Sequence, residues 1–246
     1  YLFRSRHYSH GGAFGTGSEN GACATISTVK TFGYGTKNID KRYAYNLYSD
    51  TVRVDGNIIY LENGKPLVYM PLAVELNLTN SPYIKTAGAR MAKYEVDRNA
   101  FNDGKSPDND IVLFRYADVL LMKAEAAVRN GENGNTELNL VRSRSGMGNR
   151  TATLDNILAE RLMELMWEAW RRNDLIRFNR IHQSYDLRTA PETEADRHTI
   201  VFPIPSRALD LNEKLKQNKG YKRYINPPAT PCFCVRFNTT RLRNIL

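Results

Sequence analysis

The hydrophobic pattern of the chain is clearest over residues 111–129, IVLFRYADVLLMKAEAAVR. Apolar or small side chains recur there every three or four residues, which is the spacing of one buried face of an α-helix. They are Leu113, Ala117, Leu120, Leu121, Ala124 and Ala127. The pattern predicts a helix that begins at Phe114 or Arg115 and ends at Asn130, before Gly131. Because its alanines are small, we expect a neighbouring helix to approach it closely.

The same period predicts further helices downstream. Thr136–Arg144 is expected to run antiparallel to the first helix, and Leu154 to about Trp170 forms a second long helix with Thr153 as its N-cap. Leu175–His182 is a shorter helix, and Leu209–Lys216 a helical turn. Two helical hairpins in succession indicate stacked pairs of the tetratricopeptide kind, although the strict repeat consensus is absent.

Residues 1–110 carry no helical period over most of their length and are rich in Gly, Ser, Asn and Tyr. Asp55-Gly56 and Asn63-Gly64 are turn signals beside apolar segments 57–61 and 67–72, which predicts a β-hairpin. The expected fold class is therefore mainly α, with tetratricopeptide-like helix pairs and an irregular region of loops and short strands.

Composition is that of a soluble globular protein, with 41% hydrophobic and 25% charged residues. The net charge of +9 falls to +4 without five cations that follow residue 220, where no acidic residue occurs. They are Lys222, Arg223, Arg236, Arg241 and Arg243. No basic run interleaved with aromatic residues is present, so nucleic acid is not an expected partner. Three cysteines, Cys23, Cys232 and Cys234, form no disulfide framework or zinc spacing and are expected to be plain thiols.

Several segments resemble catalytic or cofactor-binding motifs but lack the flanking elements or the spacing that those motifs require. The Gly15–Gly21 segment, GTGSENG, lacks the strand before it and the helix after it that a dinucleotide site needs. His7 and His10 have no carboxylate or cysteine close in sequence, and Asp103, Asp108 and Asp110 miss the calcium-loop spacing. No nucleophile triad, zinc-binding His-Glu-x-x-His or phosphate loop occurs, so we expect no enzyme, no metal ligand set and no cofactor.

Three glutamates, Glu160, Glu164 and Glu168, follow one another at intervals of four on the second long helix. A retaining glycosidase holds two carboxyl groups about 5 Å apart, but on opposite sides of a cleft rather than on one helix face. Arginines lie three or four residues away, so structural ion pairs are the favoured interpretation. The first helix should likewise pair Arg115 with Asp118 and Glu125 with Arg129. The residues assigned to structural ion pairs are Arg115, Asp118, Glu125, Arg161, Glu164, Glu168 and Arg171.

Four segments, taken in order, resemble the C-terminal part of the SusD/RagB family. They are RYADVLLMKAEA (115–126), NLVRSRSG (139–146), ILAERLMELMWEAWRRNDLIRF (157–178) and VFPIPSRALDLNEKLKQNKGY (201–221). The resemblance implies a surface-exposed outer-membrane lipoprotein of Bacteroidetes, lipid-anchored through an N-terminal half that lies outside this sequence. It also implies a non-catalytic protein that captures oligosaccharides or polysaccharides for nutrient uptake with a SusC-like TonB-dependent transporter. Some relatives handle peptides, and calcium occurs in some members without a location that can be carried over.

The resemblance also organises the chain. Residues 1–110 are expected to be a loop-rich, partly β, ligand-side segment, and residues 111–221 the SusD-like helical region. Ala208 and Lys219 depart from the family pattern, which has an acidic residue and a proline there. Residues 222–246 have no recognisable counterpart in the family, and we expect this tail to pack poorly.

The family motifs are scaffold, so the ligand site is sought among aromatic and polar loop residues. The densest group is Tyr34, Arg42, Tyr43, Tyr45 and Tyr48, and we expect Tyr43 or Tyr45 to stack on a glycan. Trp167 and Trp170 are assigned to the core because of their helical spacing. The alternative function is a helical-repeat scaffold that binds a protein or peptide and has no role in sugar binding.

Overall fold

The computed structural model describes residues 23–51, 53–54, 57–61, 63–84, 86–93, 110, 112–184, 186–187 and 197–221. The glycine-rich Gly15–Gly21 segment, His7 and His10, the Asp55-Gly56 turn, Asp103 and Asp108, the thiols of Cys232 and Cys234, and the tail after residue 221 lie outside these ranges. The chain divides into two compact units, residues 1–191 and 192–246, and each is described by itself.

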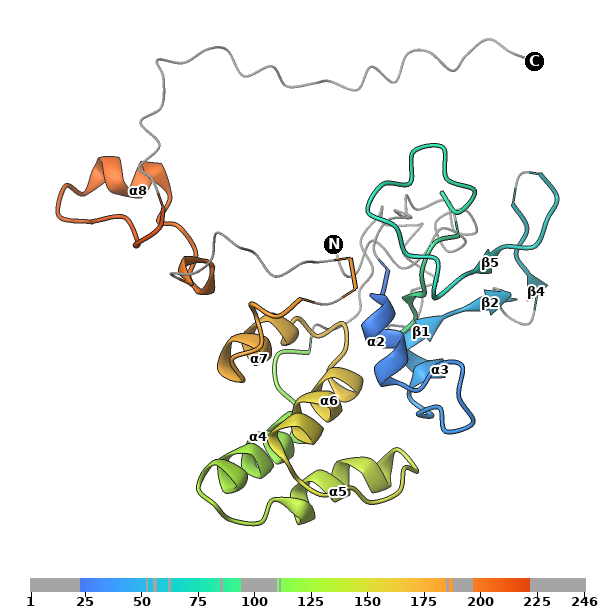
Figure 1. Cartoon of the computed structure of the whole chain (residues 1–246), viewed down its shortest axis with the longest axis horizontal. Coiled ribbons are helices and arrows are strands. Elements are labelled where there is room, and N and C mark those ends of the chain that lie inside the picture. The colour runs from blue at the N-terminus through green and yellow to red at the C-terminus, as the bar shows by residue number, and fades with distance from the viewer. Residues whose placement is uncertain are drawn as a thin grey trace, which may run out of the picture. The chain divides into compact units, whose positions relative to one another are not determined.

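Helices α4 (Tyr116–Arg129), α5 (Asn135–Arg144) and α6 (Leu154–Glu164) pack together in the first unit. Helix α4 packs against both α5 and α6, as Figure 1 shows in green and yellow. Their shared core is Ala117, Leu121, Ala124, Leu138, Val141 and Ile157. The predicted helix pairs and the mainly α fold are therefore confirmed.

The ends of these helices follow from local chemistry. Gly131 adopts a φ of +77°, and the N–H of Glu132 donates to the carbonyl of Ala127 at 2.8 Å, which closes α4 with a Schellman motif. The Thr153 side chain accepts a hydrogen bond from the N–H of Asn156, so Thr153 is the N-cap of α6 as predicted.

The second long helix is shorter than predicted. It ends at Glu164, not near Trp170, and a turn follows in which Trp167 and Ala169 have φ of 67° and 66°. These left-handed residues break the helical hydrogen-bond ladder, and α7 (Arg171–Arg177) begins after them. The short helix predicted at Leu175–His182 was therefore placed too far along the chain.

The remainder of the first unit combines two short helices with short antiparallel strands. Helix α2 (Ile26–Thr31) and helix α3 (Tyr43–Asn46) contribute to a second core together with α6. That core contains Ala24, Val29, Phe32, Tyr43, Leu47, Ala89, Met163 and Met166. The strand pairs are β1 (Leu47–Tyr48) with β6 (Arg90–Met91), β2 (Asp50–Thr51) with β5 (Val68–Tyr69), and β3 (Arg53–Val54) with β4 (Asn57–Ile58).

The predicted hairpin is present around Asn63-Gly64. Tyr60 and Pro66 form an antiparallel bridge, and the N–H of Leu67 donates to the carbonyl of Ile59 at 2.7 Å. Gly64 has a φ of +73°, the conformation for which glycine is favoured in such turns.

The second unit is described from Arg197 to Tyr221. It contains the 3-10 helix η2 (His198–Ile200) and helix α8 (Ser206–Leu211), which lies slightly before the helical turn predicted at Leu209–Lys216. The Gln217 side chain bonds both the N–H and the carbonyl of Ile204, so it holds the extended segment before α8. Among the residues described in both units, no helix is long and apolar enough to cross a membrane.

Candidate functional site

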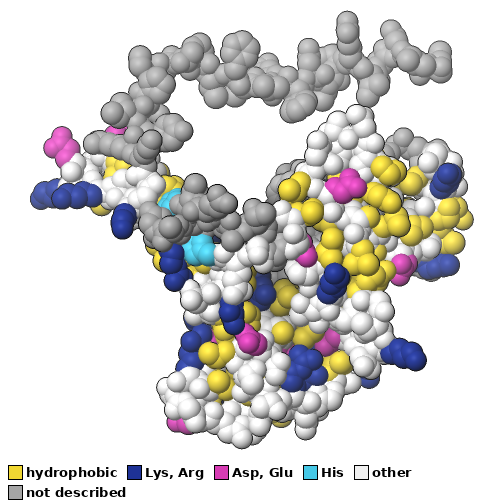
Figure 2. All heavy atoms as spheres, in the orientation of Figure 1, with side chains coloured by type: hydrophobic (Ala, Val, Ile, Leu, Met, Phe, Trp, Pro, Cys, Tyr) yellow, Lys and Arg dark blue, Asp and Glu magenta, His cyan; other side chains and the backbone are white. Residues whose placement is uncertain are grey.

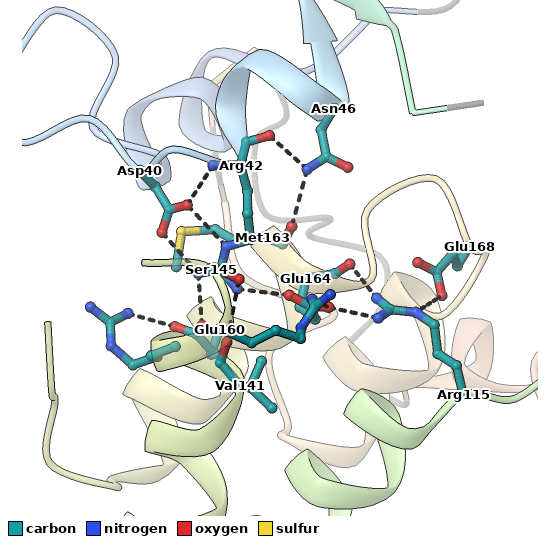
Figure 3. A network of polar contacts seen from close by, with 12 residues as sticks. Asp40, Arg42, Asn46, Arg115, Val141, Ser145, Glu160, Met163, Glu164 and Glu168 are labelled. Atoms are coloured by element: carbon teal, nitrogen blue, oxygen red, sulfur yellow. Dashed lines mark hydrogen bonds and ion pairs between the residues drawn. The ribbon is translucent and has the colours of Figure 1, made fainter. Parts of the chain in front are cut away.

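A network of buried ion pairs lies between α3, α4, α5 and α6, with Glu164 at its centre (Figure 3). The Glu164 carboxylate accepts from Arg115 Nη1 at 2.6 Å, from Arg42 Nη1 at 3.0 Å and from the Arg144 guanidinium. Burial by itself would raise the pKa of Glu164, but the hydrogen bonds and charges of these arginines outweigh it and lower that pKa. Glu164 is therefore held as a carboxylate.

Arg42 joins a loop to helix α6 within this network. Its Nε and Nη2 donate to the two oxygens of Asp40 at 2.9 and 2.8 Å, and Nη2 lies 2.7 Å from Glu160 Oε1. Burial opposes the charged form of Asp40, yet the hydrogen bonds from Arg42 lower the pKa of Asp40 overall. Arg142 Nη1 donates to the other Glu160 oxygen at 2.7 Å. Sequence spacing gave no signal for these pairs, because Arg42 and Glu164 are 122 residues apart.

A second set of ion pairs holds α4, α6 and α7 together. Asp118 pairs with Arg161 at 2.7 Å, and Glu125 pairs with Arg129 and Arg177 at 2.9 Å. The expected pairing of Arg115 with Asp118 is wrong: Arg115 reaches across to Glu164 and Glu168 instead, because it lies before the first turn of α4 in extended conformation.

The partners expected on α6 also differ. Arg161 turns to Asp118 and Asp174 rather than to the glutamates of its own helix. Arg171 Nη1 donates to the Leu158 carbonyl at 3.0 Å. The carboxylates and guanidiniums of this region thus pair across helices more than along them.

The five residues of the predicted ligand group have different exposures. Arg42 and Tyr43 are buried, Tyr34 and Tyr48 are half-buried, and the Tyr45 side chain is 75% exposed. Burial raises the pKa of the Tyr43 hydroxyl to about 12, and its ring stacks on Tyr34 with centroids 5.3 Å apart. Tyr34 and Tyr45 thus remain accessible to a ligand, while the buried ring of Tyr43 stacks against one face of Tyr34.

Tyr34 faces an open cleft of about 560 Å³, here called the Tyr34 cleft. Its polar and aromatic lining includes Tyr34, Asp50, Glu75 and Tyr83, and residues 68–74, which begin in strand β5, also line it. The Tyr34 hydroxyl donates to Asp50 Oδ1 at 3.4 Å. On the face shown in Figure 2, hydrophobic side chains gather over the strand-bearing part of this unit. The cleft combines aromatic faces with the carboxylate acceptors of Asp50 on β2 and Glu75 after the turn that follows β5.

Tyr45 faces a different hollow of about 590 Å³, here called the Tyr45 pocket. Its charged lining consists of Lys41, Arg42, Lys93, Arg115, Arg144, Glu164 and Glu168. The Lys93 ammonium contacts Glu168 and the Glu164 carbonyl. Burial, together with the charge of Arg115, lowers the pKa of Lys93 in spite of the Glu168 carboxylate.

The two tryptophans are half-buried. Trp167 packs against the α2/α3 core, and its indole N–H donates to the Asn46 carbonyl at 3.0 Å. Trp170 packs against Phe114 with ring centroids 6.0 Å apart. Both rings line an apolar pocket of about 380 Å³ beside Cys23, whose thiol has a pKa raised by burial.

No group of three or more His, Cys, Asp and Glu side chains within the described ranges is arranged to hold a metal ion. The paired carboxylates of the ion-pair network are occupied by guanidinium and ammonium groups rather than converging on an open position.

Comparison with known proteins gives a consistent assignment. The sequence model described as SusD family matches residues 29–221. The starch-binding protein SusD of Bacteroides thetaiotaomicron is 31% identical over 150 residues, which are 56% of this chain and 27% of that protein. SusD-like protein P38 of Formosa agariphila is 34% identical over 130 residues, 46% of this chain and 25% of that protein. The chain thus spans about a quarter of the length of these relatives.

A solved structure gives the same answer for the fold. A SusD superfamily protein of Bacteroides vulgatus superposes with a TM-score of 0.58 at 21% identity, covering 89% of this chain and 47% of that one. At this identity the likeness concerns the fold alone.

Proposed function

The chain belongs to the SusD family, and from this premise we propose that it captures glycans for a nutrient uptake system at the bacterial cell surface. The observation that carries the proposal is the family match over residues 29–221, joined to a 31% identical relative that is named a starch-binding protein. In this proposal the protein is a surface-exposed lipoprotein of the outer membrane. It works beside a SusC-like TonB-dependent transporter and does not cleave its ligand.

We place capture of the sugar ring at the Tyr34 cleft. Tyrosine faces offer flat apolar surface to the C–H side of a sugar, and the Asp50 and Glu75 carboxylates can accept hydrogen bonds from its hydroxyls. The cleft is lined by the paired strands β2 and β5 and by turns that carry Tyr34 and Tyr83, and binding residues are often found on such connecting segments. Tyr43, although buried, contributes by fixing the Tyr34 ring through stacking.

The electrostatics of the glutamates support the non-catalytic part of the proposal. A glycosidase needs one carboxyl group with a raised pKa to act as a general acid. The pKa of Glu164 is instead lowered, and Glu164 and Glu168 are both held by guanidinium groups. The Glu164 carboxylate would be a poor proton donor near neutral pH.

Binding of starch-derived and other oligosaccharides to the full chain, measured by glycan array and then calorimetry, tests the proposal. We expect at least one oligosaccharide class to bind, and Tyr83→Ala and Asp50→Asn to weaken that binding. Asparagine tolerates the left-handed backbone of Asp50, whose φ is 54°, so Asp50→Asn leaves the fold intact. Tyr60→Ala is the matched control, because Tyr60 is exposed and lies outside both hollows. Absence of binding to every oligosaccharide would refute the proposal.

A second candidate is a scaffold for a protein or peptide. It is favoured by an apolar face of α4 on which Tyr116, Val119 and Met122 are 73%, 48% and 43% exposed. Such a stripe at intervals of three residues could receive an amphipathic helix. Loss of peptide capture on Val119→Glu, with glycan binding absent, would favour this candidate over the first.

A further inference from the structure

We propose that the Tyr45 pocket binds the carboxylate or sulfate group of an acidic sugar unit, with the sugar ring against Tyr45. This inference rests on the proposed function and narrows its ligand class to anionic glycans. It concerns a pocket distinct from the Tyr34 cleft, and no described residue lines both of them.

The first argument is a surplus of positive charge. Among the residues that the structure describes, five cationic side chains and two carboxylates line the pocket. Asp40 lies behind the lining and neutralises part of Arg42, while Arg142 and Glu160 offset each other. Two positive charges therefore remain without a balancing carboxylate among the described residues. In a partly enclosed hollow such a surplus is less screened than at an open surface, so an anion is attracted to it.

The second argument is that Lys41 and Arg144, two cationic side chains at the rim of the pocket, can each bond a further anion. Lys41 is exposed, and no carboxylate in the described part of the chain pairs with it. Arg144 has a side chain 63% exposed, and its carboxylate partner among the described residues, Glu164, is shared with Arg42 and Arg115. A guanidinium carries five N–H donors, so Arg144 can bond an entering carboxylate or sulfate without leaving Glu164.

The third argument is the shape of the rim. Gly146 lies so close to the Lys41 ammonium that a Cβ there would be 2.9 Å from Nζ. The absence of a side chain at Gly146 leaves the ammonium at the mouth of the pocket. Tyr45, 75% exposed, lines the same pocket and offers a flat face to the ring that carries the acidic group.

The test compares paired ligands that differ only in charge. Oligogalacturonates are titrated against their methyl esters, and sulfated galactan oligosaccharides against desulfated ones, with the full chain in a calorimeter. We expect the charged member of at least one pair to bind more tightly and to lose affinity as salt rises. Lys41→Ala and Arg144→Ala should each weaken its binding by up to about fivefold, which is the range for one exposed ionic contact. Lys30→Ala, which removes an exposed cation outside the pocket, should not.

The outcomes separate this inference from the proposed function. If neutral oligosaccharides bind while neither charged member binds more tightly, the inference is wrong and the proposed function stands. If acidic ligands bind but the Lys41→Ala/Arg144→Ala double variant binds them equally well, the assignment of their binding to the Tyr45 pocket is wrong. If no oligosaccharide binds at all, both fail. Tyr45→Ala gives an independent check. It should weaken binding of the acidic ligand without changing how that affinity depends on salt.

Discussion

Arg161 Nη1 lies 2.7 Å from Asp118 Oδ1, with both side chains at most 2% exposed. The same guanidinium donates through Nε to Asp174 at 2.9 Å, so one arginine of α6 holds an aspartate of α4 and one of α7. A buried charge is tolerated only when it is paired and hydrogen-bonded, and here each member depends on the others. This triad therefore fixes how the three helices meet.

The first prediction is that Asp118→Ala strongly destabilises the protein. It leaves Arg161 buried with a single carboxylate, and breaking a buried pair costs about 3–5 kcal/mol. Urea unfolding followed by circular dichroism measures the change. The control is Asp155→Ala, which removes a pair with Arg180 whose side chains are 78% and 40% exposed, and which should cost about 1 kcal/mol or less. Equal unfolding midpoints for the two variants would show that the buried triad contributes no more to stability than the exposed pair.

The second prediction concerns the stability of the protein at acidic pH. Burial opposes ionisation of Glu164 and Glu125, but their arginine partners lower both pKa values below the ordinary 4.5. A carboxylate with a lowered folded-state pKa stabilises the protein above its unfolded pKa, and this stabilisation is lost as pH falls toward the folded pKa. The free energy of unfolding should therefore be level near pH 6 and decrease progressively below about pH 4.5.

Urea titrations at several pH values measure this slope. Glu125→Gln, which cannot ionise, should lower stability at pH 6 and reduce the decrease between pH 6 and pH 3. A stability that stays constant down to pH 3 would mean that these pairs contribute nothing to folding.

The sequence predicted the helices well because their information is local. The apolar period and the Asn130-Gly131 stop define α4 almost to the residue. The end of α6 was not predictable in this way, because its turn depends on left-handed Trp167 and Ala169, where no glycine or proline marks a break. Packing around Trp167, not local preference, holds that turn.

The candidate site was predictable in composition but not in exposure. The tyrosine-rich segment does border two hollows, through Tyr34 and Tyr45. However, helix α3 is four residues long, which is too short for a period that would tell the buried Tyr43 from the exposed Tyr45. The role of Arg42 depends on Glu160 and Glu164, more than a hundred residues away, and spacing along the chain carries no signal for such pairs.

The third prediction uses the left-handed turn after α6. Ala169 is exposed with a φ of 66°, so Ala169→Gly relieves backbone strain without removing packing. We expect unchanged or higher stability, by up to about 1 kcal/mol. Ala126→Gly is the matched control, because Ala126 is exposed inside α4 and the same change should cost about 1 kcal/mol there. Thermal unfolding measures the stability of both variants. If Ala169→Gly destabilises the protein as much as Ala126→Gly does, Ala169 does not have a strained left-handed backbone.

The last prediction tests the close approach of α5 to α4. A Cβ at Gly134, the residue before α5, would lie 2.6 Å from the Ala124 carbonyl oxygen and 3.1 Å from its Cα. These are backbone atoms of α4 and cannot rotate away, so Gly134→Ala must push the two helices apart. We expect a loss of about 1–3 kcal/mol, the usual cost of overpacking, measured by urea unfolding.

Two further variants separate crowding from helix capping. Gly134→Ser supplies a side chain that serves well as an N-cap but meets the same atoms, so it should destabilise as Gly134→Ala does if crowding is the cause. Gly148→Ala places its Cβ in open space and should leave stability unchanged or slightly higher. Recovery of full stability with serine would instead mean that α5 lacks only a cap, and that the small residues Gly134 and Ala124 do not set the distance between the helices.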